Sequence, residues 1–159
     1  MDNYKRQFID RASLEATRAN HVFPTMAACE AALESSFGTS KLAIEDFNLF
    51  GMKQHYHPIY GTHILPTREW VGISKDTKDG KQDGWVTINA SWVKYPSYTE
   101  CFIDRMNTLR RLSSSYPHYK AALEATDPIV YVKEVSATWS TDPKRAEKVI
   151  SIYKDYLKM

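Results

Sequence analysis

Apolar residues recur every three or four positions along most of the chain, which is the spacing of amphipathic helices. The first such pattern includes Phe8, and the clearest is the last, where Val149, Ile150 and Tyr153 fall on one stripe. The predicted helices cover residues 3–20, 24–37, a short stretch ending at 46, 98–112, 117–125, 128–138 and 143–157. The pattern therefore predicts a domain built mainly of helices.

Particular residues are suited to begin or end these helices. Gly38 is placed to cap the C-terminus of the second helix, because glycine adopts the left-handed backbone of such caps without strain. Thr39 or Ser40 can accept the first backbone hydrogen bonds of the short third helix. Thr141 or Asp142 can do the same for the last helix.

Residues 54–90 have a different character. Prolines and glycines punctuate short β-prone runs such as 68–71 and 85–88, and a polar turn region, 75–83, separates these two runs. This pattern predicts a β-hairpin or small sheet inserted between helices. Together with the helices it indicates an α+β fold in one domain over residues 1–159, mostly helical, with a small β lobe.

The composition narrows the class of protein. Hydrophobic residues make up 43% and charged residues 25% of the chain, which argues against disorder and against a membrane protein. A net charge of +2 is small for a nucleic-acid-binding surface. The first residues show no apolar signal region, so we expect a chain made as a soluble protein. Cys29 and Cys101 are interpreted as buried free thiols, and a disulfide between them stays open.

Glu34 is the first candidate for chemistry. It lies near the C-terminal end of the second predicted helix, after small or apolar neighbours. An apolar wall and the negative end of a helix both disfavour a carboxylate, so we expect Glu34 to hold a proton near neutral pH. A protonated carboxyl is what a glycosidase needs to protonate the leaving oxygen. The alternative is a surface glutamate on an amphipathic helix.

Two further glutamates are candidates to act with Glu34. Glu30 lies one helical turn earlier, and it either approaches the same pocket, points to solvent or pairs with a basic residue such as Arg18. Glu69 lies in the β region, where it could face the helix as the second carboxylate of a glycosidase. Its alternative is an exposed strand residue paired with Arg68 or a lysine.

Three histidines, His55, His57 and His63, are close in sequence. His55 and His57 form a His-x-His pair that can chelate a metal on a strand, but no third and fourth ligand with suitable spacing accompanies the pair. We therefore expect no metal and no cofactor.

Several stretches resemble the glucosaminidase family, glycoside hydrolase family 73. The most specific are the segments 30–43, with the sequence EAALESSFGTSKLA, and 48–53, with the sequence NLFGMK. Residues 67–69, 92–102 and 140–150 agree with later family motifs in the same order, so the resemblance spans roughly residues 20–157. The family includes flagellar peptidoglycan hydrolases, autolysins and phage lysins.

The resemblance implies a lysozyme-like fold and assigns roles to individual residues. Glu34 matches the family's general acid, and Glu69 matches the second carboxylate, acting as base or stabiliser. Tyr95 matches a tyrosine for which packing and substrate contact are both open. Two positions depart from the family pattern: Glu30 stands where a glutamine is usual, and Trp139 stands near a position where the family has a tyrosine.

The resemblance also implies the reaction, which is cleavage of a β-1,4 bond in peptidoglycan by an endo-β-N-acetylglucosaminidase. Muramidase specificity and a non-catalytic wall-binding module are the alternatives. The expected substrate-binding residues are Trp139, Tyr95, Trp70, Asn48, Glu30 and Tyr56. We expect a monomer that binds peptidoglycan glycan strands, with no nucleic acid or membrane partner. It would act on the bacterial cell wall, as a phage or prophage lysin or after export.

Overall fold

The computed structural model describes residues 1–55, 59–70 and 84–158, with backbone only at Glu69 and Trp70. Nothing in this described part of the chain forms a helix with the length and apolar character needed to cross a membrane. The described residues fall into two compact units. The helical unit joins Met1–Gly51 to Tyr95–Met159, and the hairpin unit is the intervening segment Met52–Lys94.

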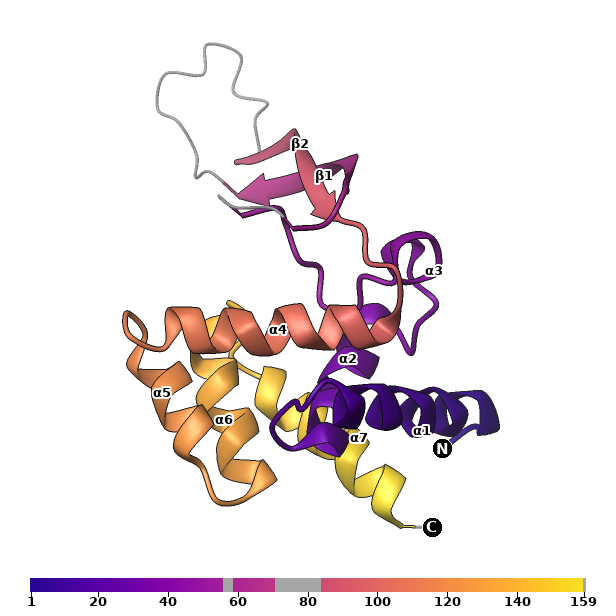
Figure 1. Cartoon of the computed structure of the whole chain (residues 1–159), viewed down its shortest axis with the longest axis vertical. Coiled ribbons are helices and arrows are strands. Elements are labelled where there is room, and N and C mark those ends of the chain that lie inside the picture. Colours follow the sequence, from indigo (N-terminus) through magenta and orange to yellow (C-terminus); the bar gives the residue numbers. More distant parts are fainter. Residues whose placement is uncertain (56–58, 71–83, 159) are drawn as a thin grey trace. The chain divides into compact units, whose positions relative to one another are not determined.

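The helical unit contains all of the predicted helices (Figure 1). They are α1 Asn3–Arg18, α2 Pro24–Ser35, α3 Lys41–Asp46, α4 Tyr98–Leu112, α5 Pro117–Glu124, α6 Pro128–Trp139 and α7 Arg145–Leu157. The apolar periodicity therefore located every helix, with ends that differ from the prediction by at most two residues. The mostly helical α+β arrangement is confirmed.

Helix α2 is the centre of the helical unit. It packs against both α1 and α7, while α4 packs against α1 and α5. Small side chains allow this close packing. The buried apolar residues of α2 are Met26, Ala27, Ala28, Cys29, Ala31 and Ala32. Because almost every side of this helix is covered, a polar side chain on it must find its partners inside the protein.

The helix ends agree with the prediction in part. Ser40 caps α3, since its Oγ accepts a hydrogen bond from the backbone N–H of Ala43. The predicted cap of the last helix is wrong, because α7 begins at Arg145 and Lys144 occupies its N-cap position. Asp142 instead accepts a hydrogen bond from the N–H of Lys144, so it stabilises the turn before the helix.

The turn after α2 contains three consecutive residues with positive φ. Ser36 is the C-cap of α2 at φ 51°, and Phe37 and Gly38 follow at 57° and 78°. The predicted cap at Gly38 is therefore two residues too late. Ser35 fastens this turn, because its Oγ donates to the carbonyl of Ala31 and accepts from the N–H of Gly38. Left-handed residues other than glycine carry strain, so contacts of this kind must compensate for it.

The hairpin unit contains two antiparallel strands, β1 Thr62–Trp70 and β2 Trp85–Val93. The predicted hairpin is confirmed, although its first strand begins later than residue 54. The polar turn predicted at 75–83 lies outside the described residues.

Both cysteines are buried and free, which confirms the interpretation as thiols and excludes the disulfide.

Candidate active site

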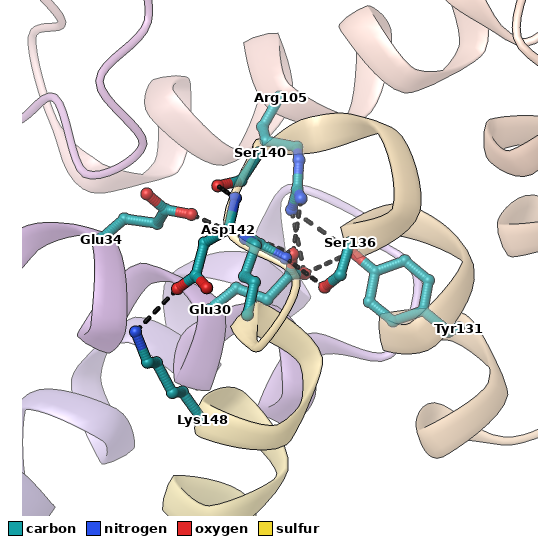
Figure 2. Close-up of polar contacts among 9 residues, drawn as sticks. Glu30, Glu34, Arg105, Tyr131, Ser136, Ser140, Asp142 and Lys148 are labelled. Atoms are coloured by element: carbon teal, nitrogen blue, oxygen red, sulfur yellow. Dashed lines mark hydrogen bonds and ion pairs between the residues drawn. The ribbon is translucent and has the colours of Figure 1, made fainter.

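A fully buried carboxylate, Glu30, lies at the centre of the polar contacts inside the helical unit (Figure 2). Arg105 of α4 donates to both of its oxygens, from Nη1 to Oε1 at 3.1 Å and from Nη2 to Oε2 at 2.7 Å. The hydroxyl of Tyr131 donates to Oε1 at 2.6 Å. Arg145 donates from Nη2 to Oε2 at 2.8 Å. Four hydrogen bonds therefore satisfy a charge that would otherwise be costly to bury.

Arg145, the first residue of α7, connects Glu30 to Glu34. Besides its bond to Glu30, its Nε donates to Glu34 Oε1 at 2.8 Å and its Nη1 donates to Ser136 Oγ at 2.8 Å. The arginine itself is 1% exposed. One guanidinium thus joins the two glutamates that face the same side of α2.

Glu34 is the part of this arrangement that reaches solvent. Its side chain is 26% exposed, whereas that of Glu30 is completely buried. The apolar wall expected around Glu34 is wrong in one respect, because a guanidinium lies in contact with the carboxyl. The sequence did not indicate this contact, since 111 positions separate Glu34 from Arg145.

The second arginine, Arg105, is held between two aromatic rings. Its guanidinium carbon lies 4.5 Å from the ring centre of Phe50 and 4.3 Å from that of Trp139. Cation–π contacts of this kind favour a buried guanidinium. Trp139 is half-buried, so part of its ring is engaged in packing on Arg105 and the rest remains accessible. Stacking of Trp139 on a sugar stays a prediction.

The electrostatics of the buried residues follow from these contacts. Burial alone would raise the pKa of Glu30, but the charges and hydrogen bonds of Arg105 and Arg145 outweigh it and lower the pKa to about 2. His21 is also buried, and burial together with the charge of Arg105 lowers its pKa to about 4. Burial raises the pKa of Tyr131 well above its ordinary value. At neutral pH, Glu30 is therefore charged, while His21 and Tyr131 are neutral.

Of the environments predicted for Glu30, pairing with a basic residue is confirmed, but its partners are Arg105 and Arg145. Glu30 neither points to solvent nor pairs with Arg18, which forms an exposed ion pair with Glu15 instead. Glu30 has no exposed surface and accepts four hydrogen bonds, and its contact with substrate stays a prediction. The helical pattern placed Glu30 on the same face as Glu34 correctly, but only the packing of α2 between its neighbours decided that this position is interior.

Two other predicted substrate-binding residues are buried as well. Tyr95 is 4% exposed and its hydroxyl donates to Asp104 Oδ2 at 2.5 Å. Asn48 is 1% exposed, in the turn that follows α3. The structure gives Tyr95 a packing and hydrogen-bonding role, and substrate contact by either residue stays a prediction.

The structure does not describe the side chains of the other three predicted site residues, Tyr56, Glu69 and Trp70. Tyr56 lies outside the described residues entirely. The backbone of Glu69 pairs with Val86 in the hairpin. The role of Glu69 as second carboxylate stays a prediction.

The sequence reasoning missed Arg105, Arg145, Tyr131 and Ser136, yet the sequence carries a signal for two of them. Arg105 lies three or four residues from Cys101, Phe102 and Leu109, all on the buried side of α4. Arg145 lies four residues before the buried Val149. A charged residue on an apolar stripe requires a buried partner, and Glu30 on the alanine-rich helix α2 is such a partner.

A helical unit with a partly exposed glutamate on its central helix, interrupted by a β-hairpin, is the arrangement of lysozyme-like glycosidases. The chain matches the sequence model of the family Glucosaminidase, described as mannosyl-glycoprotein endo-beta-N-acetylglucosaminidase, over residues 11–158. It belongs to that family, and the predicted membership and lysozyme-like fold are confirmed.

Relatives and solved structures agree with this membership. The chain is 33% identical to the exo-glucosaminidase LytG of Bacillus subtilis over 86% of its own length and 45% of that protein. It is 26% identical to a probable N-acetylmuramidase of Lactococcus lactis subsp. cremoris, over 97% of the chain and 34% of that protein.

The crystal structure of the catalytic domain of the autolysin Auto from Listeria monocytogenes superposes with a TM-score of 0.77 at 29% identity. The match covers 99% of this chain and 86% of that one. The chain thus spans less than half the length of the two curated relatives, but nearly the whole of this catalytic domain.

Proposed function

We propose that this chain is a peptidoglycan hydrolase that cuts a β-1,4 glycosidic bond of the glycan strand, with Glu34 as general acid. The observation that carries the proposal is the position of Glu34. It lies in the last turn of α2, with a side chain that is 26% exposed and a defined partner in Arg145, and the resemblance to the family's motif suggests it as the acid. A carboxyl that is anchored and still accessible can meet a substrate oxygen.

The reaction needs two events at the scissile bond. Glu34 gives its proton to the leaving oxygen while positive charge develops on the sugar ring. A water molecule then completes hydrolysis, either activated directly by Glu69 or after attack by the substrate's own N-acetyl oxygen, with Glu69 stabilising the charged intermediate. The direct route inverts the anomeric centre and the assisted route retains it, so NMR of the first-formed product separates them.

The bond that we propose is the one after N-acetylglucosamine, because the family and the relative LytG are both named for glucosaminidase activity. Muramidase specificity is the second candidate, since a relative in Lactococcus lactis is named a probable N-acetylmuramidase. Mass spectrometry of digested, borohydride-reduced cell wall distinguishes the two, because the new reducing end is N-acetylglucosamine in the first case and N-acetylmuramic acid in the second.

The test of catalysis is loss of turbidity of purified cell walls together with release of reducing ends. We expect Glu34→Gln to lower the rate by about 100-fold or more, as for loss of a general acid. Glu147→Gln, which changes an exposed glutamate in the first turn of α7, is the matched control and should keep the wild-type rate. Equal clearing by wild type and Glu34→Gln contradicts the acid assignment. Binding to walls without reducing ends from the wild type indicates a non-catalytic module.

A further inference from the structure

The guanidinium of Arg145 is fixed in three directions at once. Its three nitrogens donate to three different acceptors, Nη1 to Ser136, Nη2 to Glu30 and Nε to Glu34, each at 2.8 Å. Because a guanidinium is planar and its N–H directions are rigid, three such bonds determine both its place and its plane. The group that meets Glu34 is therefore immobile.

The anchors of Arg145 are more deeply buried than the residue it holds. Glu30 is 0% exposed and Ser136 is 8% exposed. Glu30 lies one turn before Glu34 on α2. Arg145 therefore links the partly exposed side chain of Glu34 to a buried residue of the same helix. A side chain at the surface would ordinarily sample several rotamers, and the hydrogen bond from Arg145 favours one of them for Glu34.

We propose that Arg145 is a positioning residue for the acid, holding Glu34 through Oε1 so that Oε2 carries the proton used in the reaction. The inference rests on the proposed function. Oε1 already accepts the N–H of Arg145, and within the described residues Oε2 accepts no hydrogen bond. The proton that leaves for the glycosidic oxygen therefore sits on Oε2, and Arg145 decides which way that oxygen points.

The charges around Arg145 allow its geometry to be tested apart from its charge. Arg105 and Arg145 contribute two positive charges to this cluster, and the carboxyl groups of Glu30 and Glu34 are their partners. Arg145→Lys keeps both positive charges, but a single ammonium group cannot replace three N–H groups directed at three separate acceptors. The variant therefore disturbs the orientation of Glu34 while leaving the net charge of the cluster unchanged.

The experiment measures kcat and KM on a soluble glycan fragment of peptidoglycan. We expect Arg145→Lys to lower kcat by about 10- to 100-fold with KM within about twofold, because misplacing a reacting group by about 1 Å costs that much. Ser136→Ala removes only one anchor, so kcat should fall less, again at constant KM. Ile9→Ala is the control, since Ile9 is fully buried on α1 and forms no hydrogen bond to Arg145, Glu30 or Glu34. It should lower Tm and keep kcat.

A second readout is chemical rescue of Arg145→Ala. Guanidinium chloride at non-denaturing, millimolar concentration should restore part of kcat, and ammonium chloride at the same ionic strength should not. Wild-type kcat in Arg145→Lys and Ser136→Ala overturns the inference. Equal kcat losses in Arg145→Lys and Ile9→Ala overturn it as well. If Glu34→Gln is inactive in the same assay, that result leaves the proposed function standing. If Glu34→Gln is fully active, that result contradicts both the proposed function and the inference about Arg145.

Discussion

Arg105 and Glu30 form a two-bond ion pair between α4 and α2, and neither side chain has any surface exposed to solvent. A pair of this kind does not guarantee stability by itself, because desolvation of both charges offsets their attraction. Removing either residue is nevertheless destabilising, because the other charge then stays buried without a partner. The consequences are measurable.

Removal of the Glu30 charge should destabilise the protein strongly. Glu30→Gln leaves Arg105 without its carboxylate and Arg145 with Glu34 alone, so we expect a loss of about 3 to 5 kcal/mol in unfolding free energy. For a chain of this size that corresponds to a Tm lower by about 10 °C, measured by circular dichroism. Lys148→Gln breaks the exposed pair with Asp142 and should cost less than about 1 kcal/mol. Similar losses in both variants would contradict the role of the buried carboxylate.

Stability should decrease as the pH is lowered from about 6.5 to 4 because of His21. Its pKa is lowered from 6.5 to about 4 in the folded protein, since burial and the charge of Arg105 disfavour the imidazolium. Between these values the unfolded chain binds the proton more readily, so acid favours unfolding, by about 3 kcal/mol once the pH is below both.

The measurement is urea unfolding at several pH values for the wild type and His21→Gln, which cannot titrate. The contribution of Glu30 to stability is also lost in acid, but between its unfolded pKa of 4.5 and its folded pKa of about 2, so it overlaps the window of His21 only below about pH 4.5. A parallel pH dependence in wild type and His21→Gln between pH 6.5 and 5 would exclude the histidine as the cause.

The turn after α2 should tolerate no side chain at Gly38. A Cβ there would lie 2.7 and 2.8 Å from ring carbons of Phe8 and 3.1 Å from the hydroxyl of Tyr98, on a backbone with φ +78°. We expect Gly38→Ala to cost about 2 to 4 kcal/mol, from backbone strain and overpacking together. Gly61→Ala, where a Cβ meets nothing within 4 Å, is the control and should change stability by less than about 0.5 kcal/mol. Equal effects would show that the turn can relax.

Much of the architecture could be predicted from local sequence, because helices and hairpins depend on residues that are near each other in the chain. The apolar stripe through Val149 and Ile150, the cap at Ser40 and the β-prone runs each specify their element without any distant partner. The family motif around Glu34 likewise lies in one short segment, so the candidate acid could be recognised before any contact was known.

What the tertiary structure alone decided is the environment of that acid. Glu30 and Glu34 lie on one face of α2 by helical spacing, yet one is buried and the other reaches solvent because of how α2 packs. Arg145 joins them from a position more than 110 residues away. Burial and charge pairing arise from packing between distant segments, so they cannot be predicted from a local sequence pattern. The sequence by itself determined which elements form and which glutamate to examine; the packing determined that this glutamate is held by an arginine.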